Sequence, residues 1–267
     1  MAALCDWAIR SDQPGRYHSS PVDLMRRHAF TLIELLVVIG VVAVLLGILA
    51  PSLARLRVSA YESKTLAQLR DLGVTIEIYL QSSRDTYPWR TPGEPYFFAP
   101  PGTMTGSIST SDDPWALRYL WPVLMHQTAP WSEHYLSWMG SRPSLGDNRL
   151  PWQGDGVGSP QYPAYEYSNS FVGDPSCWMP SGRAIVRPIR QPSVRFPSAK
   201  VLMFDASRSY LPIAFLEDAR RGVLLADGSA ALHHDSDATS PVENRLRPSF
   251  GASIYHDTQA GVLGRDF

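Results

Sequence analysis

The chain is poor in cysteine, in net charge and in recognisable catalytic motifs. It has two cysteines in 267 residues, Cys5 and Cys177, which make neither a disulfide framework nor a metal-ligand spacing. Its 24 Lys and Arg residues balance 25 Asp and Glu residues, so the usual electrostatic argument for a nucleic-acid partner is absent. No G-x-S-x-G elbow, Walker loop or H-E-x-x-H pair is present. We therefore expect neither an enzyme nor a nucleic-acid partner.

One long apolar run stands near the N-terminus. Residues 30–50 read FTLIELLVVIGVVAVLLGILA, and Glu34 is the only charged side chain between Arg27 and Arg55. About 20 apolar residues are needed for a helix to cross a bilayer. The run is longer than the roughly 7–15 apolar residues of a secretory signal, and core helices are rarely apolar on every face. The sequence predicts a transmembrane helix.

Glu34 is the unusual residue of this run. A carboxylate at mid-membrane costs about 2.5–3.5 kcal/mol on insertion scales, and less near an edge. Two interpretations stay open: Glu34 snorkels to the interface, or it meets a positive partner when subunits pack side by side.

The stretch RRHAFTLIELL, residues 26–36, resembles the N-terminal signal of type IV prepilins and type II secretion pseudopilins. The resemblance implies cleavage by prepilin peptidase between Ala29 and Phe30, methylation of the new amine on Phe30, and a role for Glu34 in subunit assembly. Pro51 falls where the family commonly has a proline, and we expect a helix kink there. The family usually has glycine before the cut, whereas this chain has Ala29, so we expect slower cleavage.

The resemblance also implies a function and a location. It implies a pilin-like structural subunit, a pseudopilin, assembled into a type II secretion-like or type IV pilus-like filament. The protein would be a single-pass protein of the bacterial inner membrane with its globular domain on the periplasmic side. Its partners would be prepilin peptidase, other pilin-like subunits, the inner-membrane assembly platform and membrane lipid. The alternative is a membrane-tethered module that binds polysaccharide or a surface partner through its Trp-rich ectodomain.

We divide the chain into six segments. They are a leader peptide over 1–29, a transmembrane helix over 30–51, an amphipathic continuation of that helix over 52–83, a Pro/Trp-rich loop region over 84–199, a C-terminal β-sheet segment over 200–234, and a polar tail over 235–267, which we expect to be loose. The leader begins at Met1 or at Met25, and the basic stretch MRRHA favours Met25.

The predicted fold class is α+β, with the long helix packed on a small antiparallel sheet and long irregular loops. An apolar face recurs at three- and four-residue steps in the helix continuation, at Leu66, Leu69, Leu72, Ile76 and Tyr79. The loop region holds seventeen prolines and seven tryptophans, with a short helix expected from Asp113 to His126. Its aromatic side chains either pin down loops, which we favour, or form a binding face.

Short apolar runs near the C-terminus predict strands at 184–187, 200–204, 210–215 and 222–226. Asp227-Gly228 predicts a two-residue hairpin turn, because Gly readily takes the positive φ that such turns need. The stretch RRGVLLADGSAALHH resembles the C-terminal end of prepilin-like proteins marked by His-x9-Asp-Gly, with Glu217 where that group has His.

We expect no metal and no cofactor. Some pseudopilins hold calcium near the C-terminal end, and Asp235 and Asp237 are the weak candidates here, beside His233 and His234. Calcium needs six to eight oxygen ligands, and the sequence does not display them.

Overall fold

The computed structural model describes residues 31–91, 113–125, 128–129, 134, 137–138, 163–181, 183–206, 220–248 and 251–267. The chain divides into two compact units, Met1–Ala50 and Pro51–Phe267. Helix α1 (Leu32–Ser82) contributes to both and continues through Pro51. Together with a four-stranded antiparallel sheet, this gives the α+β fold that the sequence predicts.

The first half of α1 has no core of its own. Every residue from Thr31 to Ala50 is exposed, including the large apolar side chains of Leu36, Val41 and Ile48. The two glycines here, Gly40 and Gly47, have nothing within 4 Å of the position a Cβ would take. Helix formation in this half therefore rests on backbone hydrogen bonds and on an apolar environment that the chain does not supply.

The second half of α1 carries an apolar stripe that is buried. Leu69, Leu72, Ile76 and Leu80 are at most 3% exposed and belong to the main core. This confirms the apolar face expected from the sequence, although its outer members Leu66 and Tyr79 are only half-buried. The helix ends just after Ser82, where Arg84 and Asp85 both take positive φ and the amide of Asp85 donates to Leu80 O at 2.9 Å.

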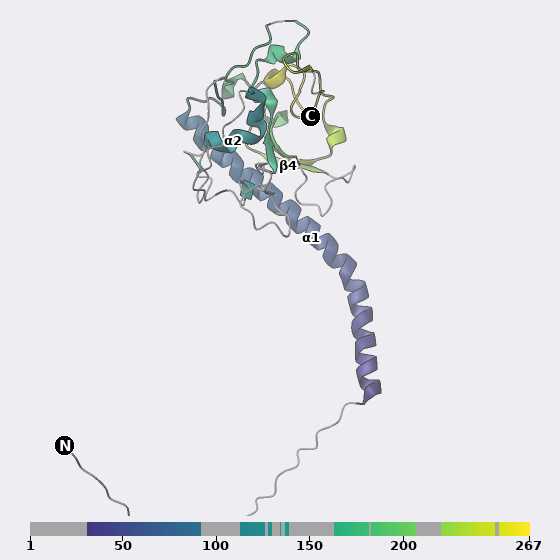
Figure 1. Cartoon of the computed structure of the whole chain (residues 1–267). Helices are drawn as coiled ribbons and strands as arrows, with labels where there is room; N and C mark the ends of the chain where they lie inside the picture. The colour runs from purple at the N-terminus through teal and green to yellow at the C-terminus, as the bar shows by residue number, and fades with distance from the viewer. Residues whose placement is uncertain are drawn as a thin grey trace, which may run out of the picture. The chain divides into compact units, whose positions relative to one another are not determined.

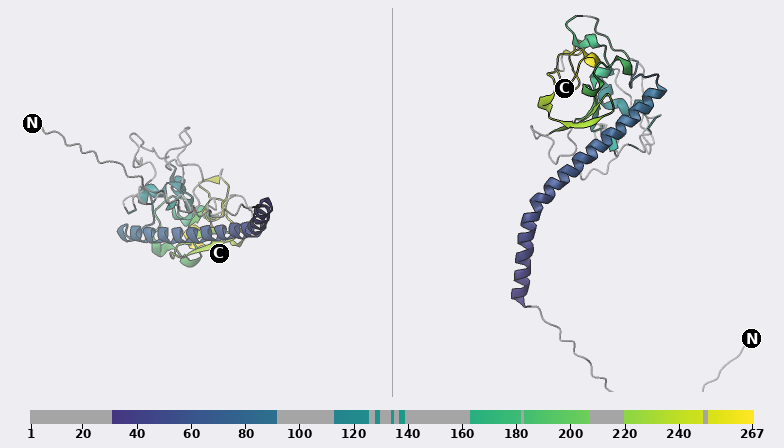
Figure 2. Two further views of the ribbon diagram at one scale, coloured as in Figure 1. Left: turned by 90° about the horizontal axis from the view of Figure 1, so that it is seen from below. Right: turned by 180° about the vertical axis from the view of Figure 1, so that it is seen from behind.

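The sheet runs in the order β1-β2-β3-β4, with every neighbouring pair antiparallel. Its strands are β1 (Tyr165–Tyr167), β2 (Val201–Asp205), β3 (Arg221–Leu225) and β4 (Ala230–His233). The second half of α1 lies along this sheet (Figures 1 and 2), and a Cβ on Gly222 of β3 would come within 2.7 Å of Thr65 Cγ2. Only glycine permits so close an approach.

The predicted hairpin joins β3 to β4. Gly228 takes φ +84° at the turn, but the amide of Leu225 donates to Ser229 O at 2.8 Å, so the loop holds three residues, 226–228, and the predicted two-residue length is wrong. The strands predicted at 200–204 and 222–226 are confirmed to within one residue as β2 and β3.

The remaining two predicted strands are not confirmed. The strand predicted at 184–187 is wrong: it forms one isolated bridge, Val186 with Gly173, and Pro188 follows at once. The one predicted at 210–215 lies outside the described residues, as does Glu217. Strand β1, which has three residues and pairs with β2, was not predicted.

The loop region packs through its aromatic side chains. Asp113 caps the predicted short helix by accepting from the amide of Trp115 at 3.0 Å; the helix comprises the 3-10 turn Pro114–Ala116 and α2 (Leu117–Met125). Of the five tryptophans described between residues 84 and 199, four are at most 4% exposed: Trp115, Trp121, Trp138 and Trp178. These four stabilise the core, as the favoured interpretation expects, rather than form a binding face.

The segment after β4 is not a loose tail. Tyr255, His256, Asp257, Val262 and Asp266 are at most 5% exposed, and the C-terminus lies within the globular unit in each view (Figure 2). The expectation of a loose polar tail is wrong, because its polar side chains find partners in the interior instead of water.

Candidate functional site

The N-terminus of α1 is closed by a pair of side chains. The amide and the hydroxyl of Thr31 both donate to Glu34 Oε2, at 2.9 and 2.8 Å, and the amide of Glu34 donates to Thr31 Oγ1 at 3.2 Å. This is a reciprocal capping box, which satisfies helix-end donors that have no intrahelical partner. Glu34 therefore has a partner inside its own chain.

This arrangement bears on the site residues predicted from the sequence. Ala29 and Phe30, on either side of the predicted cut, lie outside the described residues. Glu34 stands in the first turn of α1, and Pro51 lies inside the helix; the kink stays a prediction. The capping role of Glu34 was not predicted, although Thr-x-x-Glu before an apolar run indicates a helix start.

The structure describes the surroundings of Asp235 and Asp237, the two weak candidates for a calcium site. Arg221, itself 9% exposed, donates from Nε to Asp235 Oδ1 at 2.8 Å and from Nη2 to Asp235 Oδ2 at 2.7 Å. Asp237 ends a short 3-10 helix. Within the described parts of the chain, no group of three or more His, Cys, Asp or Glu side chains is placed to hold a metal ion. The expectation of no metal stays a prediction, with Asp235 and Asp237 as the weak calcium candidates.

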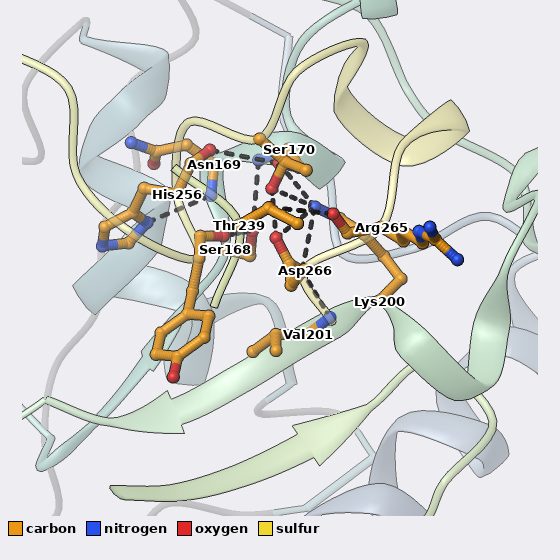
Figure 3. A network of polar contacts seen from close by, with 11 residues as sticks. Ser168, Asn169, Ser170, Lys200, Val201, Thr239, His256, Arg265 and Asp266 are labelled. Atoms are coloured by element: carbon orange, nitrogen blue, oxygen red, sulfur yellow. Dashed lines mark hydrogen bonds and ion pairs between the residues drawn. The ribbon is translucent and has the colours of Figure 1, made fainter. Parts of the chain in front are cut away.

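The interior of the globular unit contains a polar cluster that the sequence did not reveal (Figure 3). Lys200 is 0% exposed, and its Nζ lies 3.1 Å from Asp266 Oδ2. The same ammonium donates to the hydroxyls of Ser170, at 3.1 Å, and Thr258. Asp266 also accepts from the amide of Val201 at 2.7 Å. The cluster joins the C-terminal segment to the start of β2.

The buried charges of Lys200 and Asp266 determine the role of this cluster. Burial lowers the pKa of Lys200, although the adjacent Asp266 carboxylate opposes that shift. Removing one partner of such a pair leaves an uncompensated charge in the interior, which costs about 3–5 kcal/mol. Because Lys200 has no exposed surface and is fully hydrogen-bonded, the cluster holds the fold together and is not placed to meet a substrate.

A second polar pair lies beside it. His256 Nε2 is 2.8 Å from Glu166 Oε2, while His256 Nδ1 accepts from the amide of Asn169 at 3.2 Å. Burial by itself would raise the pKa of Glu166, but the hydrogen bond with His256 and the nearby guanidinium groups of Arg118 and Arg221 outweigh it, and the pKa lies below its usual value. Burial raises the pKa of the Cys177 thiol to about 11, which leaves little of the nucleophilic thiolate near neutral pH.

Comparison with known proteins identifies one part of the chain. Residues 24–50 match the family model of the prokaryotic N-terminal methylation motif. No curated protein and no solved structure matches the chain.

The matched residues overlap, over residues 32–50, with α1, which is the one described helix that is long and apolar enough to cross a membrane. The match ends at Ala50, and the globular unit begins at the next residue, Pro51. The motif and the apolar helix together indicate that the N-terminal helix anchors the protein in a membrane. The chain thus carries a type IV pilin-like prepilin signal, of the kind that prepilin peptidase processes.

Proposed function

We propose that this chain is a pilin-like structural subunit, a pseudopilin, that assembles after cleavage into a type II secretion-like or type IV pilus-like filament. The observation that carries the proposal is the first half of α1: an apolar surface that is exposed throughout and begins with one carboxylate. A bilayer covers such a surface before assembly, and the same helices of neighbouring subunits cover it afterwards.

Cleavage before Phe30 creates a cationic amine one residue from the capping box. In a filament, Glu34 of one subunit would form an ion pair with the Phe30 amine of its neighbour. Each charge is unfavourable when it is buried alone, and pairing offsets that free energy. The anchored protein would lie in the bacterial inner membrane with its globular unit on the periplasmic side. It would bear no catalytic activity, and its partners would be prepilin peptidase, other pilin-like subunits and an assembly platform.

The test must separate intermolecular pairing from helix capping, because Glu34 serves both. Glu34→Leu removes both functions, whereas Thr31→Val removes only the hydroxyl of the capping box. We expect Glu34→Leu to insert in the membrane and be cleaved, yet fail to cross-link into oligomers with other pilin-like subunits. Thr31→Val should still assemble.

Glu77→Gln is the matched control, since Glu77 is an exposed carboxylate on the same helix outside the apolar half. It should assemble normally. Assembly of Glu34→Leu at the wild-type level would contradict the proposal. Equal loss in Thr31→Val and Glu34→Leu would show that Glu34 acts through capping and not through pairing.

A further inference from the structure

A small polar cavity of about 50 Å³ lies in the globular unit, among α2, the 3-10 helix η2 (Asn169–Phe171) and the C-terminal segment. Such a volume takes about one or two waters, or the head group of a small molecule. Seven of its lining residues have polar side chains: Arg118, Asn169, Asn244, Arg247, Ser253, His256 and Asp257. The lining contains no aliphatic side chain, so the cavity favours a polar occupant.

Two buried amide side chains in this lining have unpaired atoms. Asn169 and Asn244 are each 2% exposed. Asn244 Oδ1 accepts from the amide of Leu246 at 2.9 Å, which fixes the orientation of the group and leaves its Nδ2 as a donor without a partner. Asn169 Oδ1 is an acceptor without a partner. Buried polar groups normally have a hydrogen-bond partner, so these atoms call for an occupant of the cavity.

Donors outnumber free acceptors around the cavity. The two oxygens of Asp257 already accept, from Trp178 Nε1 at 3.0 Å and from the amide of Ser253 at 2.9 Å. His256 is engaged with Glu166 through its Nε2. The guanidinium groups of Arg118 and Arg247 and the amide of Asn244 bring only donors. The occupant must therefore supply one acceptor for Asn244 Nδ2 and one donor for Asn169 Oδ1, and the neighbouring guanidinium groups favour an anionic acceptor.

We propose that this cavity binds a small carboxylate that carries a neighbouring hydroxyl or N–H donor. The carboxylate accepts from Asn244 Nδ2 and from the guanidinium groups of Arg118 and Arg247, and guanidinium is the side chain best matched to carboxylate geometry. The neighbouring donor bonds to Asn169 Oδ1. This head group occurs in free hydroxy acids and in acidic sugars. The inference rests on the globular unit alone, so its failure leaves the subunit function untouched.

The test uses the full chain in detergent micelles and follows the indole N–H resonance of Trp178, which reports on the cavity because it donates to Asp257. Titration with sodium glycolate should give a saturable shift, with a Kd on the order of 1 mM. Acetate lacks the hydroxyl and should bind about tenfold more weakly, because Asn169 Oδ1 stays unpaired. Sodium chloride at matched ionic strength should give no saturable shift.

Variants make the test specific. Asn244→Asp keeps the acceptor for Leu246 but replaces the free donor with an anionic oxygen, and should raise the Kd for glycolate at least tenfold. Arg265→Gln lowers the net charge by the same amount at an exposed position outside the cavity lining and should bind like the wild type. If Asn244→Asp does not fold, Arg118→Gln takes its place, with the Kd again raised.

Glucuronate distinguishes the two sources of the head group. Tighter binding than glycolate points to an acidic sugar, and weaker binding points to a free hydroxy acid. The absence of a saturable glycolate shift, an unchanged Kd in the cavity variant, or a crystal structure grown in glycolate with water alone in the cavity would overturn the inference.

Discussion

The two halves of α1 show what the same secondary structure needs in two settings. From Leu32 to Ala50 the helix is apolar on all sides and fully exposed. From Thr65 to Leu80 it is amphipathic, and its apolar stripe is buried by the sheet and by loops of its own chain. The first half is therefore built for an environment outside the chain, whereas the second half is part of the globular core.

The largest effect is expected when an aspartate replaces an apolar residue in each half of α1. Leu72 is 1% exposed, and Leu72→Asp buries an unpaired charge at a cost comparable with the whole stability of a domain, about 5–15 kcal/mol. We expect near-UV circular dichroism of the globular unit to be lost. Val42→Asp should leave that signal intact and reduce membrane insertion, at a cost of about 2.5–3.5 kcal/mol. Equal damage to the globular signal by both variants would remove the distinction between the halves.

A smaller effect is expected when a side chain is added to a glycine of each half. A Cβ on Gly73 would lie 3.0 Å from Leu224 Cδ1, whereas Gly40 has nothing within 4 Å. Gly73→Val should lower the free energy of unfolding by about 1–3 kcal/mol through overpacking against β3. Gly40→Val is the control and should leave the thermal midpoint of the globular unit unchanged. An unchanged midpoint for Gly73→Val would show that the helix is not held closely against the sheet.

The smallest effect concerns acid, which should act on the globular half. The pKa of Glu166 in the folded state lies below its ordinary value of 4.5. Its contribution to stability is therefore complete above pH 4.5 and is lost as the pH falls through the lowered folded pKa, since the unfolded chain takes up the proton first. Glu166→Gln should flatten the stability profile below pH 4.5 in denaturant titrations. A variant profile parallel to the wild type would contradict the role of the His256 pair.

The sequence predicted those parts of the fold that have a local pattern. The apolar run, the stripe around Leu72 and the turn at Asp227-Gly228 each follow from residues close together in the chain. The packing of the C-terminal segment does not: Ser170 Oγ donates to His256 O across 86 residues, and Lys200 meets Asp266 across 66. Polar residues that pair over such separations leave no periodic signal.

The candidate sites also divide into those that have a local sequence pattern and those that do not. The signal around Phe30 was readable because cleavage depends on a short continuous motif, and the motif comparison agrees with it. The capping box of Thr31 and Glu34 also has a local pattern, Thr-x-x-Glu before an apolar run. The cavity at Asn169 and Asn244 was beyond reach, because it arises only when distant segments fold together.

The central claim is that the first half of α1 is a processed prepilin-type segment, and the mass of the mature protein tests it most directly. The full chain is co-expressed with a prepilin peptidase, recovered from the membrane fraction and measured intact by mass spectrometry. The account predicts a chain that begins at Phe30 and is heavier by one methyl group on its amine. A mature chain that begins beyond the apolar run, or a chain left uncleaved while a variant with Ala29→Gly is also uncleaved, would contradict it.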